Sequence, residues 1–505
     1  MQRSSGATAS VWMETAAEPS RPALAQDTSV DVCVVGAGIA GLTTAYLLAA
    51  EGRSVLVLDD GPIAGGETSR TTAHLANALD DRYVELERLH GETGARLAAE
   101  SHSAAIDRLE AIVAKEHIVC DFERLDGYLF APPGDTGAGL DDELEAAHRA
   151  GLTTVERVAR APLEGFDTGA CLRFPRQAQV HPLQYLGGLV RAFETCGGRI
   201  CNSTHVVAVH DGAPGRITTD QGMVVSAGAI VVATNTPVND RVAIHTKQAA
   251  YRTYVIGVQV PRGSVTRALY WDTLDPYHYV RLQQMGTEEM LLVGGEDHKT
   301  GQAEDTDERF ARLEAWTRER FVSAGAVACR WSGQIMEPVD SLALIGRNPG
   351  DQHVYIVTGD SGHGMTHGTI AGMLLTDLIQ GRENRWATLY DPARLSLRAG
   401  WEFAKENLNV AAQYRDYVTG SDVATVDAIA PGTGAVLREG LFKVAVYRDS
   451  HGALHRCSAL CPHLAGIVRW NTTEHTWDCP CHGSRFDPYG TVLNGPAIVG
   501  LTPAE

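Results

Sequence analysis

Two short stretches near the end of the chain carry the residue types and the spacing of a metal centre. The first reads Cys461-Pro-His463, and after fifteen residues the second reads Cys479-Pro-Cys481-His482. Two thiolates and two imidazoles on separate loops can hold a [2Fe–2S] cluster in which two histidines replace two cysteines on one iron. A zinc knot uses the same ligand types but usually groups like ligands with like. Each loop here pairs one cysteine with one histidine, which favours the cluster and one-electron chemistry.

The second stretch runs directly into Gly483 and Ser484, and the whole arrangement resembles the Rieske iron–sulfur family. The resemblance implies an all-β domain at the C-terminal end of the chain and a Rieske-type [2Fe–2S] cluster. It also implies four cluster ligands, which are Cys461, His463, Cys479 and His482.

Residues around the proposed ligands bear on the reduction potential. The resemblance implies that the Ser484 hydroxyl bonds a bridging sulfide, whereas Phe486 stands where high-potential members have a tyrosine hydroxyl. Fewer hydrogen bonds to sulfur stabilise the reduced cluster less, so we expect a potential in the lower part of the roughly −150 to +300 mV Rieske range. Members of the respiratory bc type also bridge their two loops with a cysteine pair. Cys481 occupies one of those positions but Gly466 occupies the other, so no such bridge is expected.

A second constellation lies near the beginning of the sequence. An apolar run over 32–35 leads into Gly36-Ala-Gly38-Ile-Ala-Gly41, then into a helical segment and a second apolar strand that ends at Asp59. The glycines suit a tight turn, a close approach to a pyrophosphate and close helix–strand packing. The phosphates would sit on the helix N-terminus, and the acid would accept from a ribose hydroxyl. The pattern therefore predicts a dinucleotide site.

The stretch after this second strand indicates which dinucleotide is bound. Residues 65–75 resemble the FAD-covering segment of the flavin amine oxidases of the D-amino-acid oxidase, glycine oxidase and sarcosine oxidase group. The resemblance continues in order through 180–209, 229–235 and two blocks between 331 and 379. It implies FAD as the cofactor. It also implies the residues that bind FAD, which are Gly36, Gly38, Gly41, Asp59, Ser69, Arg70, Thr71, Thr72, His74, Val206, Ala233, Thr234, Gly362, His363, Gly364, Met365 and Thr366.

These assignments predict an α/β FAD-binding domain of Rossmann type, an antiparallel-sheet substrate domain and a C-terminal all-β Rieske domain. Residues 251–260, 277–284 and 289–294 alternate aromatic and β-branched side chains as strands do. Members of the flavin family use such a sheet as a roof over the flavin.

The domain boundaries follow from the same resemblances. We expect a disordered tail over 1–29, an oxidoreductase domain over 30–400, a helix and linker over 401–424, and a Rieske domain over 425–505. Within the oxidoreductase domain, the FAD-binding parts are expected near 30–80, 180–240 and 335–395, and the substrate parts near 81–179 and 241–334.

The catalytic residues of the flavin half are less marked. Members of the family often hold a substrate carboxylate with an arginine and place a tyrosine or histidine nearby. This implies four candidates, which are His363, Tyr279, Arg281 and His278. Tyrosine and arginine alternating on a strand are also typical of an ordinary packing or solvent face, so a structural role stays open for the three residues on the roof strand.

A flavin and a [2Fe–2S] centre in one chain predict a converter between two-electron and one-electron transfer. The leading hypothesis is an amine or amino-acid dehydrogenase. FAD would take hydride from a carbon that bears nitrogen, and the cluster would pass the electrons to an external acceptor such as a ferredoxin-like protein, a quinone or O2.

Two alternatives stay open. One is a reductase with inward electron flow from NAD(P)H or a ferredoxin through the cluster, although no second dinucleotide fingerprint follows residue 60. The other is a non-catalytic redox relay or sensor. A self-contained Rieske oxygenase would need two histidines and a carboxylate on a further iron, and no such cluster stands out.

The composition of the 505 residues sets outer limits. A formal net charge of −19 argues against nucleic acid or an anionic membrane surface as a partner. No apolar run approaches the roughly 18–20 residues of a transmembrane helix. The first 29 residues lack a signal-peptide pattern, and the ten cysteines lack the dense spacing of a secreted disulfide scaffold. We therefore expect a cytoplasmic protein with a small-molecule substrate, and the oligomeric state stays open.

Overall fold

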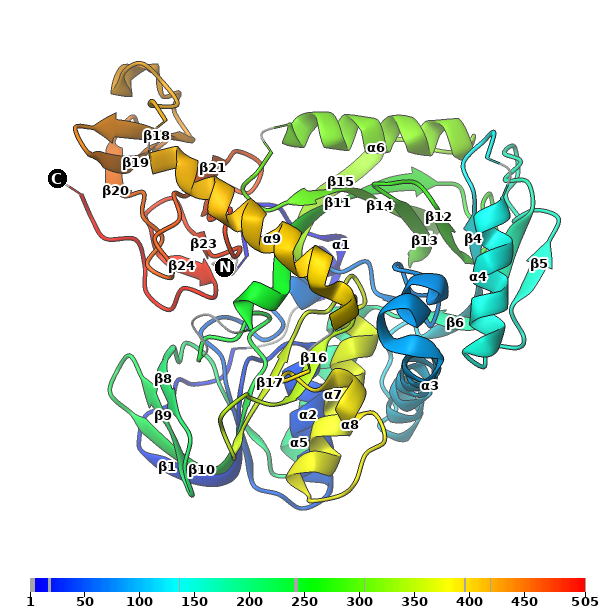
Figure 1. The fold of residues 1–505 in the computed structure, drawn as a ribbon, viewed down its shortest axis with the longest axis horizontal. Coiled ribbons are helices and arrows are strands. Elements are labelled where there is room, and N and C mark those ends of the chain that lie inside the picture. Colours follow the sequence, from blue (N-terminus) through cyan, green and yellow to red (C-terminus); the bar gives the residue numbers. More distant parts are fainter. Residues whose placement is uncertain are drawn as a thin grey trace.

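Three structural parts make up the chain, and Figure 1 shows their arrangement in the computed structural model. The first is built on a mostly parallel sheet, the second on a large antiparallel sheet, and the third on two small antiparallel sheets. The structure describes residues 5–16, 20–135, 137–239, 244–303, 305–394, 397–417 and 419–504.

The first sheet has the strand order β16-β17-β10-β1-β2-β7, and β8 and β9 continue it beside β10. β1 pairs in parallel with both β2 and β10, and its apolar end is buried on both faces, as expected when both sides of a sheet are covered. Helices α2 (Ile39–Ala50), α5 (Pro182–Thr195) and α7 (Gly364–Ile379) pack together on one side. The strands are β1 (Thr28–Val35), β2 (Val55–Leu58), β7 (Arg199–Cys201), β8 (Val206–His210), β9 (Gly215–Thr219), β10 (Val224–Val232), β16 (Leu344–Arg347) and β17 (Val354–Thr358).

The second sheet has the order β15-β11-β14-β13-β12-β4-β6-β3, with β5 beside β6. Helix α6 (Thr306–Arg320) covers its outer face (Figure 1), where Phe310 and Trp316 pack on Tyr254 and Val293. The opposite face is therefore turned toward the first part. The strands are β3 (His74–Leu75), β4 (Glu123–Phe130), β5 (Glu156–Val158), β6 (Cys171–Gln179), β11 (Gln248–Val260), β12 (Leu269–Asp272), β13 (His278–Met285), β14 (Glu288–Lys299) and β15 (Val327–Pro338). Helices α3 (Tyr83–Lys115) and α4 (Ala138–Arg149) connect β3 to β6 at the far end.

The third part is all-β, as the sequence predicts. Its two sheets enclose a core that contains Cys461, Cys479 and Trp477. The first sheet consists of β18 (Thr433–Glu439), β19 (Phe442–Arg448) and β20 (Leu454–Ser458). The second consists of β21 (Arg469–Asn471), β22 (Thr476–Asp478), β23 (Arg485–Phe486) and β24 (Val492–Asn494). The predicted fold class is confirmed in all three parts.

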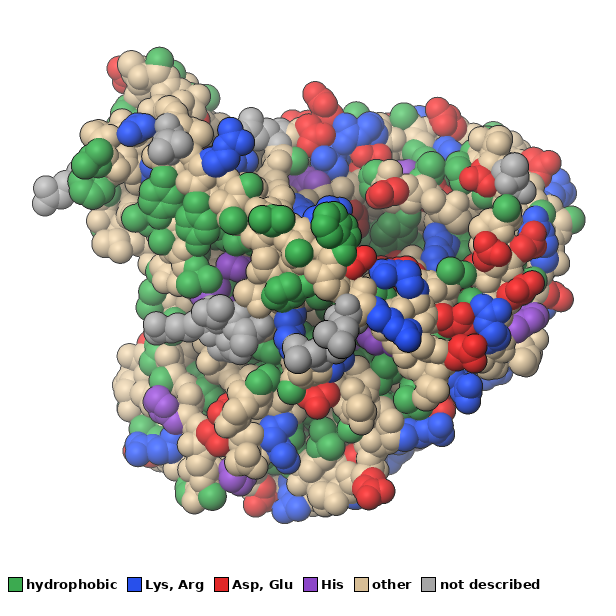
Figure 2. Space-filling view, viewed as in Figure 1, with side chains coloured by type: hydrophobic (Ala, Val, Ile, Leu, Met, Phe, Trp, Pro, Cys, Tyr) green, Lys and Arg blue, Asp and Glu red, His purple; other side chains and the backbone are tan. Residues whose placement is uncertain are grey.

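Helix α9 (Gly400–Gln413) crosses from the first part to the third, and the short turn η4 (Tyr414–Tyr417) continues it (Figure 1). The hydroxyls of Tyr414 and Tyr417 donate to the carbonyls of Leu464 and Ala465, at 2.7 and 2.6 Å. Apolar side chains lie exposed along α9, and Trp401 is 76% exposed (Figure 2). The short segments α8 (Ala387–Tyr390) and η3 (Leu397–Ala399) precede α9, and η5 (Val426–Ala428) follows it.

The segment Ser5–Ala16 contradicts the expected disordered tail. It forms helix α1 (Val11–Thr15), and Trp12 is fully buried. The Trp12 indole donates to the Thr71 carbonyl at 2.6 Å, and its ring meets that of His181 at 4.8 Å. The sequence prediction failed because such a short helix has no periodicity of its own and is held by distant parts of the chain. Residues 1–4 and 17–19 lie outside the described residues.

A buried ionic cluster joins the three parts. The Glu474 carboxylate, on the third part, lies 3.1 Å from Arg70 and 3.5 Å from Arg252. It also accepts from the backbone and the hydroxyl of Thr8, at 3.1 and 2.6 Å. Arg485 donates to the Ser5 carbonyl at 2.7 Å. Because a buried charge is costly unless it is paired, these contacts fix the three parts in one arrangement.

Candidate functional site

A cavity of about 290 Å³ lies where the three parts meet. The carboxyl ends of β1, β2, β10 and β17 form its floor, and β11, β12 and β13 form its roof. The third part supplies a wall from β24 and the following loop, with Val492, Asn494, Gly495 and Ala497 among the lining residues. Ligands of open parallel sheets bind outside these strand ends, as this cavity would allow.

The glycines at the nucleotide end are required by close backbone approaches. Gly36 has a φ of +107°, and a Cβ there would lie 2.4 Å from the Ala233 carbonyl. A Cβ on Gly41 would lie 2.0 Å from the Gly36 carbonyl. Gly41 therefore packs the helix against the turn and does not line the cavity. The cradle this leaves at the start of α2 fits a pyrophosphate, which the N-terminus of a helix favours.

Asp59 ends β2 at the cavity, as predicted. Its carboxylate accepts from the N–H of Ala37 at 2.6 Å and of Gly61 at 2.8 Å. Burial raises the Asp59 pKa to about 7, and the charge of Asp60 adds to this effect. Such a group is suited to accept from a ribose hydroxyl, which would add a hydrogen bond to a carboxylate that is already partly buried.

Most of the predicted FAD-binding residues line the cavity, and three do not. The exceptions are Gly41, Ser69 and Thr366. The Ser69 carbonyl accepts from the hydroxyl of Ser10, and the Thr366 hydroxyl bonds His102 at 3.0 Å, so these two support the loops behind the cavity. The lining residues are Gly36, Gly38, Asp59, Arg70, Thr71, Thr72, His74, Val206, Ala233, Thr234, Gly362, His363, Gly364 and Met365.

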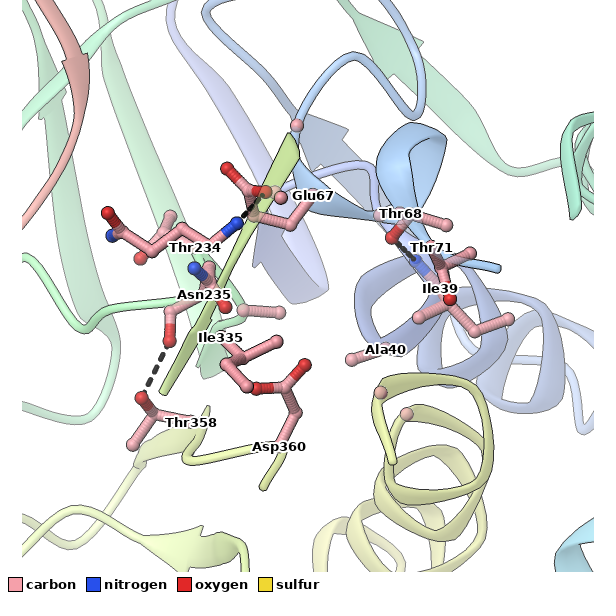
Figure 3. Close-up of a pocket in the computed structure, with 18 of the residues that line it drawn as sticks. Ile39, Ala40, Glu67, Thr68, Thr71, Thr234, Asn235, Ile335, Thr358 and Asp360 are labelled. Carbon is pink, nitrogen blue, oxygen red and sulfur yellow. Dashed lines mark hydrogen bonds between the residues drawn. The ribbon is translucent and has the colours of Figure 1, made fainter. Parts of the chain in front are cut away.

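Sequence reasoning missed several polar residues that face the cavity, and Figure 3 shows three of them. Glu67 and Asp360 point into the space between the strands and α2, and Asn235 lies beside Thr358. Glu67 accepts from the Gln334 backbone at 2.7 Å and from the Asn494 amide at 3.2 Å. Glu67 lies within the block that carries the family resemblance, so a signal existed, but its bridging role depends on residues far away in sequence.

Two of the four predicted catalytic residues lie at the roof end of the cavity. His363 accepts through Nε2 from the Asp80 backbone at 3.0 Å. The hydroxyls of Tyr279 and Thr253 hydrogen-bond each other at 2.7 Å. Asp80 also lines this end, and its carboxylate accepts from the Tyr277 hydroxyl at 2.7 Å.

The structure places the other two predicted catalytic residues, His278 and Arg281, away from the cavity lining. His278 is on the opposite face of β13, where it bonds Asp272 at 2.9 Å and stacks on Trp316 at 4.5 Å. Strand side chains alternate between faces, which separates His278 from Tyr279.

Arg281 shares a strand face with Tyr279 but is fully buried. Its guanidinium donates to the carbonyls of Thr72, Ala73 and Val180, at 2.9 to 3.1 Å. Burial, with the nearby charge of Arg267, lowers the Arg281 pKa to about 9. The residue therefore holds the loop that carries Thr72, and its guanidinium does not line the cavity.

The two predicted cluster-binding stretches form two tight adjacent loops. Cys461 N–H donates to the Gly466 carbonyl at 2.9 Å, and Cys479 N–H donates to the Ser484 carbonyl at 2.8 Å. The side chains of Cys461 and Cys479 lie close enough to interact. Each loop thus presents one thiol beside the other loop's thiol.

The two histidines of these loops also lie close together. The rings of His463 and His482 are 5.1 Å apart, and Nδ1 of His482 is buried without a hydrogen-bond partner. An orphaned ring nitrogen on a loop that also carries a cysteine fits a metal ligand. Among the described residues, no three His, Cys, Asp or Glu side chains gather as a single ion would require. Two sulfur and two nitrogen ligands in separate pairs fit a [2Fe–2S] cluster better than zinc.

The cluster loops abut the wall of the flavin cavity. Gln334 lines the cavity and donates through Nε2 to the Gly483 carbonyl at 3.0 Å. The His245 ring lies 4.9 Å from that of His463 and 6.2 Å from that of His482. The same second loop that carries His482 therefore contacts a residue of the flavin cavity.

Comparisons with known proteins agree with this architecture. Residues 31–378 match the family model described as FAD dependent oxidoreductase (DAO), and residues 421–503 match the Rieske [2Fe-2S] domain. A putative Rieske 2Fe-2S iron-sulfur protein of Bacillus subtilis (strain 168), YhfW, is 31% identical over 97% of this chain and 96% of its own. The gamma-glutamylputrescine oxidoreductase of Escherichia coli (strain K12) is 26% identical over 72% of this chain and 86% of its own.

Among solved structures, glycine oxidase from Geobacillus kaustophilus aligns with a TM-score of 0.62 and 18% identity, over 73% of this chain and 99% of its own. The fold, the two matched families and the full-length relative converge on one assignment. As predicted, the chain binds FAD and a [2Fe–2S] cluster, and it belongs to the DAO family of FAD-dependent oxidoreductases, with a Rieske domain at its C-terminal end.

Proposed function

We propose that this oxidoreductase oxidises a C–N bond of an amine or amino acid and passes the electrons from FAD through the Rieske cluster to an external acceptor. The observation that carries the proposal is the shared wall. β24 of the Rieske domain lines the same cavity as the FAD-binding glycines, and Gln334 joins that cavity to the cluster loop. Bound FAD supplies a two-electron acceptor, whereas the cluster carries one electron at a time.

The side chains of the roof form a site of a size and shape suited to a small molecule. Thr253, Trp271 and Tyr279 extend from three strands over the cavity, and Tyr277 joins them from the loop before β13. The relatives support a nitrogen-bearing substrate, because the Escherichia coli relative is named for gamma-glutamylputrescine. We therefore assign the oxidation of a C–N bond to this end of the cavity.

Anaerobic mixing with a panel of amines and amino acids tests the proposal. We expect a substrate to bleach the flavin absorbance and then to produce the electron paramagnetic resonance signal of the reduced cluster. The His482→Ala variant lacks a ligand and should show no cluster signal, which assigns that signal. Reduction of both centres by NAD(P)H or reduced ferredoxin, with no response to any amine or amino acid, would overturn the proposal in favour of inward flow.

We further propose a cytoplasmic location. All ten cysteines lie in the described part of the chain and none is paired in a disulfide, which suits a reducing compartment. No helix among the described residues has both the length and the apolar character needed to cross a membrane. The external acceptor would be a ferredoxin-like protein, a quinone or O2, and oxidation of the reduced enzyme by each in turn distinguishes them.

A further inference from the structure

The end of the cavity under the second sheet has its own chemical character. Side chains from three strands and three loops line it, and we call this set of residues the roof pocket: Asp80, Thr253, Trp271, Tyr277, Tyr279 and His363. One member carries a carboxylate, and four members carry aromatic or imidazole rings. The charge and the rings together restrict which substrates fit.

Asp80 is held at the centre of the roof pocket. Its Oδ2 accepts from the Tyr277 hydroxyl at 2.7 Å and lies 3.5 Å from His363 Nε2. A Cβ on Gly362 would lie 2.6 Å from the same oxygen, so the carboxylate rests directly on the loop between β17 and α7. The side chain keeps 21% exposure, which leaves the carboxylate accessible from the cavity.

Among the described residues of the roof pocket, no arginine or lysine pairs with Asp80. Among the described residues that line the cavity, Arg70 alone has a cationic side chain other than histidine. Its guanidinium is fully buried and already donates to the Ser332 carbonyl at 2.7 Å, the Thr8 carbonyl at 2.9 Å and Glu474. Arg281, which would be the carboxylate clamp, is bound to three backbone carbonyls. A substrate carboxylate would therefore find no exposed arginine or lysine among the described residues of the cavity lining.

Further buried carboxylates stand behind the pocket. Asp297 follows Gly294 on β14, whose partner on β13 is Tyr279, and its Oδ1 is buried without a hydrogen-bond partner. Burial raises the Asp297 pKa to about 7 and, with the charge of Asp80, raises that of Asp81 to about 6. Carboxylates with raised pKa values indicate a site that a bound cation would stabilise.

The ring-bearing walls independently favour a cation. Trp271, Tyr277 and Tyr279 line the same cavity as Asp80, the Tyr277 hydroxyl contacts its carboxylate, and the Tyr277 and Tyr279 ring centres are 5.5 Å apart. Aromatic faces attract ammonium groups, and the attraction is stronger where water is excluded. A carboxylate with aromatic neighbours is therefore suited to an alkylammonium group.

Building on the proposed function, we propose that the substrate is a cationic amine with no carboxylate on the reacting carbon, a simple alkylamine or diamine, and that Asp80 and the rings of the roof pocket bind its ammonium group. This narrows the substrate from amines and amino acids to amines. It makes Asp80 a substrate-binding residue and removes the arginine clamp from the recognition of the substrate.

The first test measures binding without turnover. Tetramethylammonium and acetate are titrated into the holoenzyme, and perturbation of the flavin absorbance is followed. We expect saturable binding of the cation and none of acetate at the same concentrations. Tetramethylammonium has no N–H, so Asp80 can attract it through charge alone. Loss of that charge in Asp80→Asn should weaken cation binding about ten-fold, and Asp80→Glu should restore part of it. Asp220→Asn, an identical change at an exposed turn, should bind as the wild type does.

The second test compares each amine with its carboxylated counterpart: ethylamine with alanine, benzylamine with phenylglycine, and putrescine with ornithine. We expect kcat/KM to be at least about ten-fold higher for the amine in each pair, since one lost charged contact is worth about that factor. FAD content and cluster absorbance of Asp80→Asn, compared with the wild type, show whether the variant is folded.

The two tests separate the two claims. A preference for the carboxylated partners, or wild-type cation binding by a folded Asp80→Asn, overturns the cationic pocket. If tetramethylammonium binds through Asp80 but no amine reduces the flavin, the proposed oxidation fails while the cation site stands.

Discussion

The Glu474 carboxylate lies 3.1 Å from the guanidinium of Arg70, and both side chains are fully buried although 404 residues separate them in the sequence. Arg70 lines the flavin cavity, and Glu474 belongs to the Rieske domain. The pair therefore joins the two redox parts of the molecule at a point where water cannot replace either partner.

Removal of the Glu474 charge should destabilise the interface between the Rieske domain and the rest of the chain. Glu474→Gln leaves Arg70, Arg252 and Arg485 without their shared counter-charge, and breaking a buried pair costs about 3–5 kcal/mol. We expect the urea concentration at the unfolding midpoint to fall by the amount that this loss of free energy of unfolding implies. Glu308→Gln, the same change on the exposed face of α6, serves as the control and should stay within about 0.5 kcal/mol of the wild type. Equal midpoints for Glu474→Gln and wild type would show that the cluster does not stabilise the fold.

The same carboxylate sets an acid limit on stability. Burial raises the Glu474 pKa, but the guanidinium groups of Arg70, Arg252 and Arg485 outweigh burial and lower it to about 2. In the unfolded chain the pKa of a glutamate is about 4.3. Because the folded pKa is the lower one, the stabilisation is complete above about pH 5 and is lost as the pH falls from about 4.3 toward 2. Unfolding midpoints measured against pH should therefore fall more steeply in the wild type than in Glu474→Gln over this window.

Truncation of Trp12 tests the order of the segment Ser5–Ala16. Its indole is fully buried and bonds the Thr71 carbonyl, and replacing a buried tryptophan by alanine costs about 3–5 kcal/mol. Because Thr71 lines the flavin cavity, FAD release should also become faster, and flavin fluorescence reports it. Trp401→Ala removes an exposed ring on α9 and is the matched control. If Trp12→Ala and Trp401→Ala lose equally little stability, the segment is not held as described.

The pair formed by Gly466 and Cys481 should accept a disulfide. A Cβ at position 466 would lie 2.6 Å from the Cys481 Sγ and 3.4 Å from its Cβ, close to the spacing of bridged cysteines. Gly466→Cys should therefore form a bridge to Cys481 under mild oxidation, which mass spectrometry after thiol alkylation detects. Gly466→Cys combined with Cys481→Ser should keep its new thiol free. A free thiol at position 466 in the single variant would contradict the loop geometry.

A hydroxyl at position 486 should raise the potential of the cluster. Phe486 is fully buried in the same core as Cys461 and Cys479. Phe486→Tyr adds a donor near the sulfur ligands, and such hydrogen bonds favour the reduced state. A redox titration followed by electron paramagnetic resonance should give a wild-type value in the lower part of the Rieske range and a higher value for the variant. A wild-type potential near the top of the range would refute this argument.

Local patterns made the cofactor sites predictable. The glycines from Gly36 to Gly41 and the loops around Cys461 and Cys479 lie in short contiguous stretches, so spacing alone carries the chemistry. The place of Asp59 at the cavity was predictable for the same reason, because it follows a strand at a fixed distance from the glycines.

Residues whose roles depend on distant partners were not predictable in this way. Strand alternation separates His278 from Tyr279, but it does not reveal that the Arg281 guanidinium donates its hydrogen bonds to backbone carbonyls. Asp80 lies in a loop without periodicity. Trp12 is buried by contacts with Thr71 and His181, which are distant from it in the sequence. These positions are defined by tertiary contacts, which leave no pattern in neighbouring residues.

The contacts of Thr8 with Glu474 span 466 residues, so they bear on the order in which the protein is completed. During synthesis the segment Ser5–Ala16 leaves the ribosome long before its partner on the Rieske domain exists, and such distant contacts form last. Until then the flavin cavity lacks the wall formed by Val492 and Asn494. In a newly made chain the flavin cavity is therefore open on this side, and FAD can enter there until the Rieske domain folds against it.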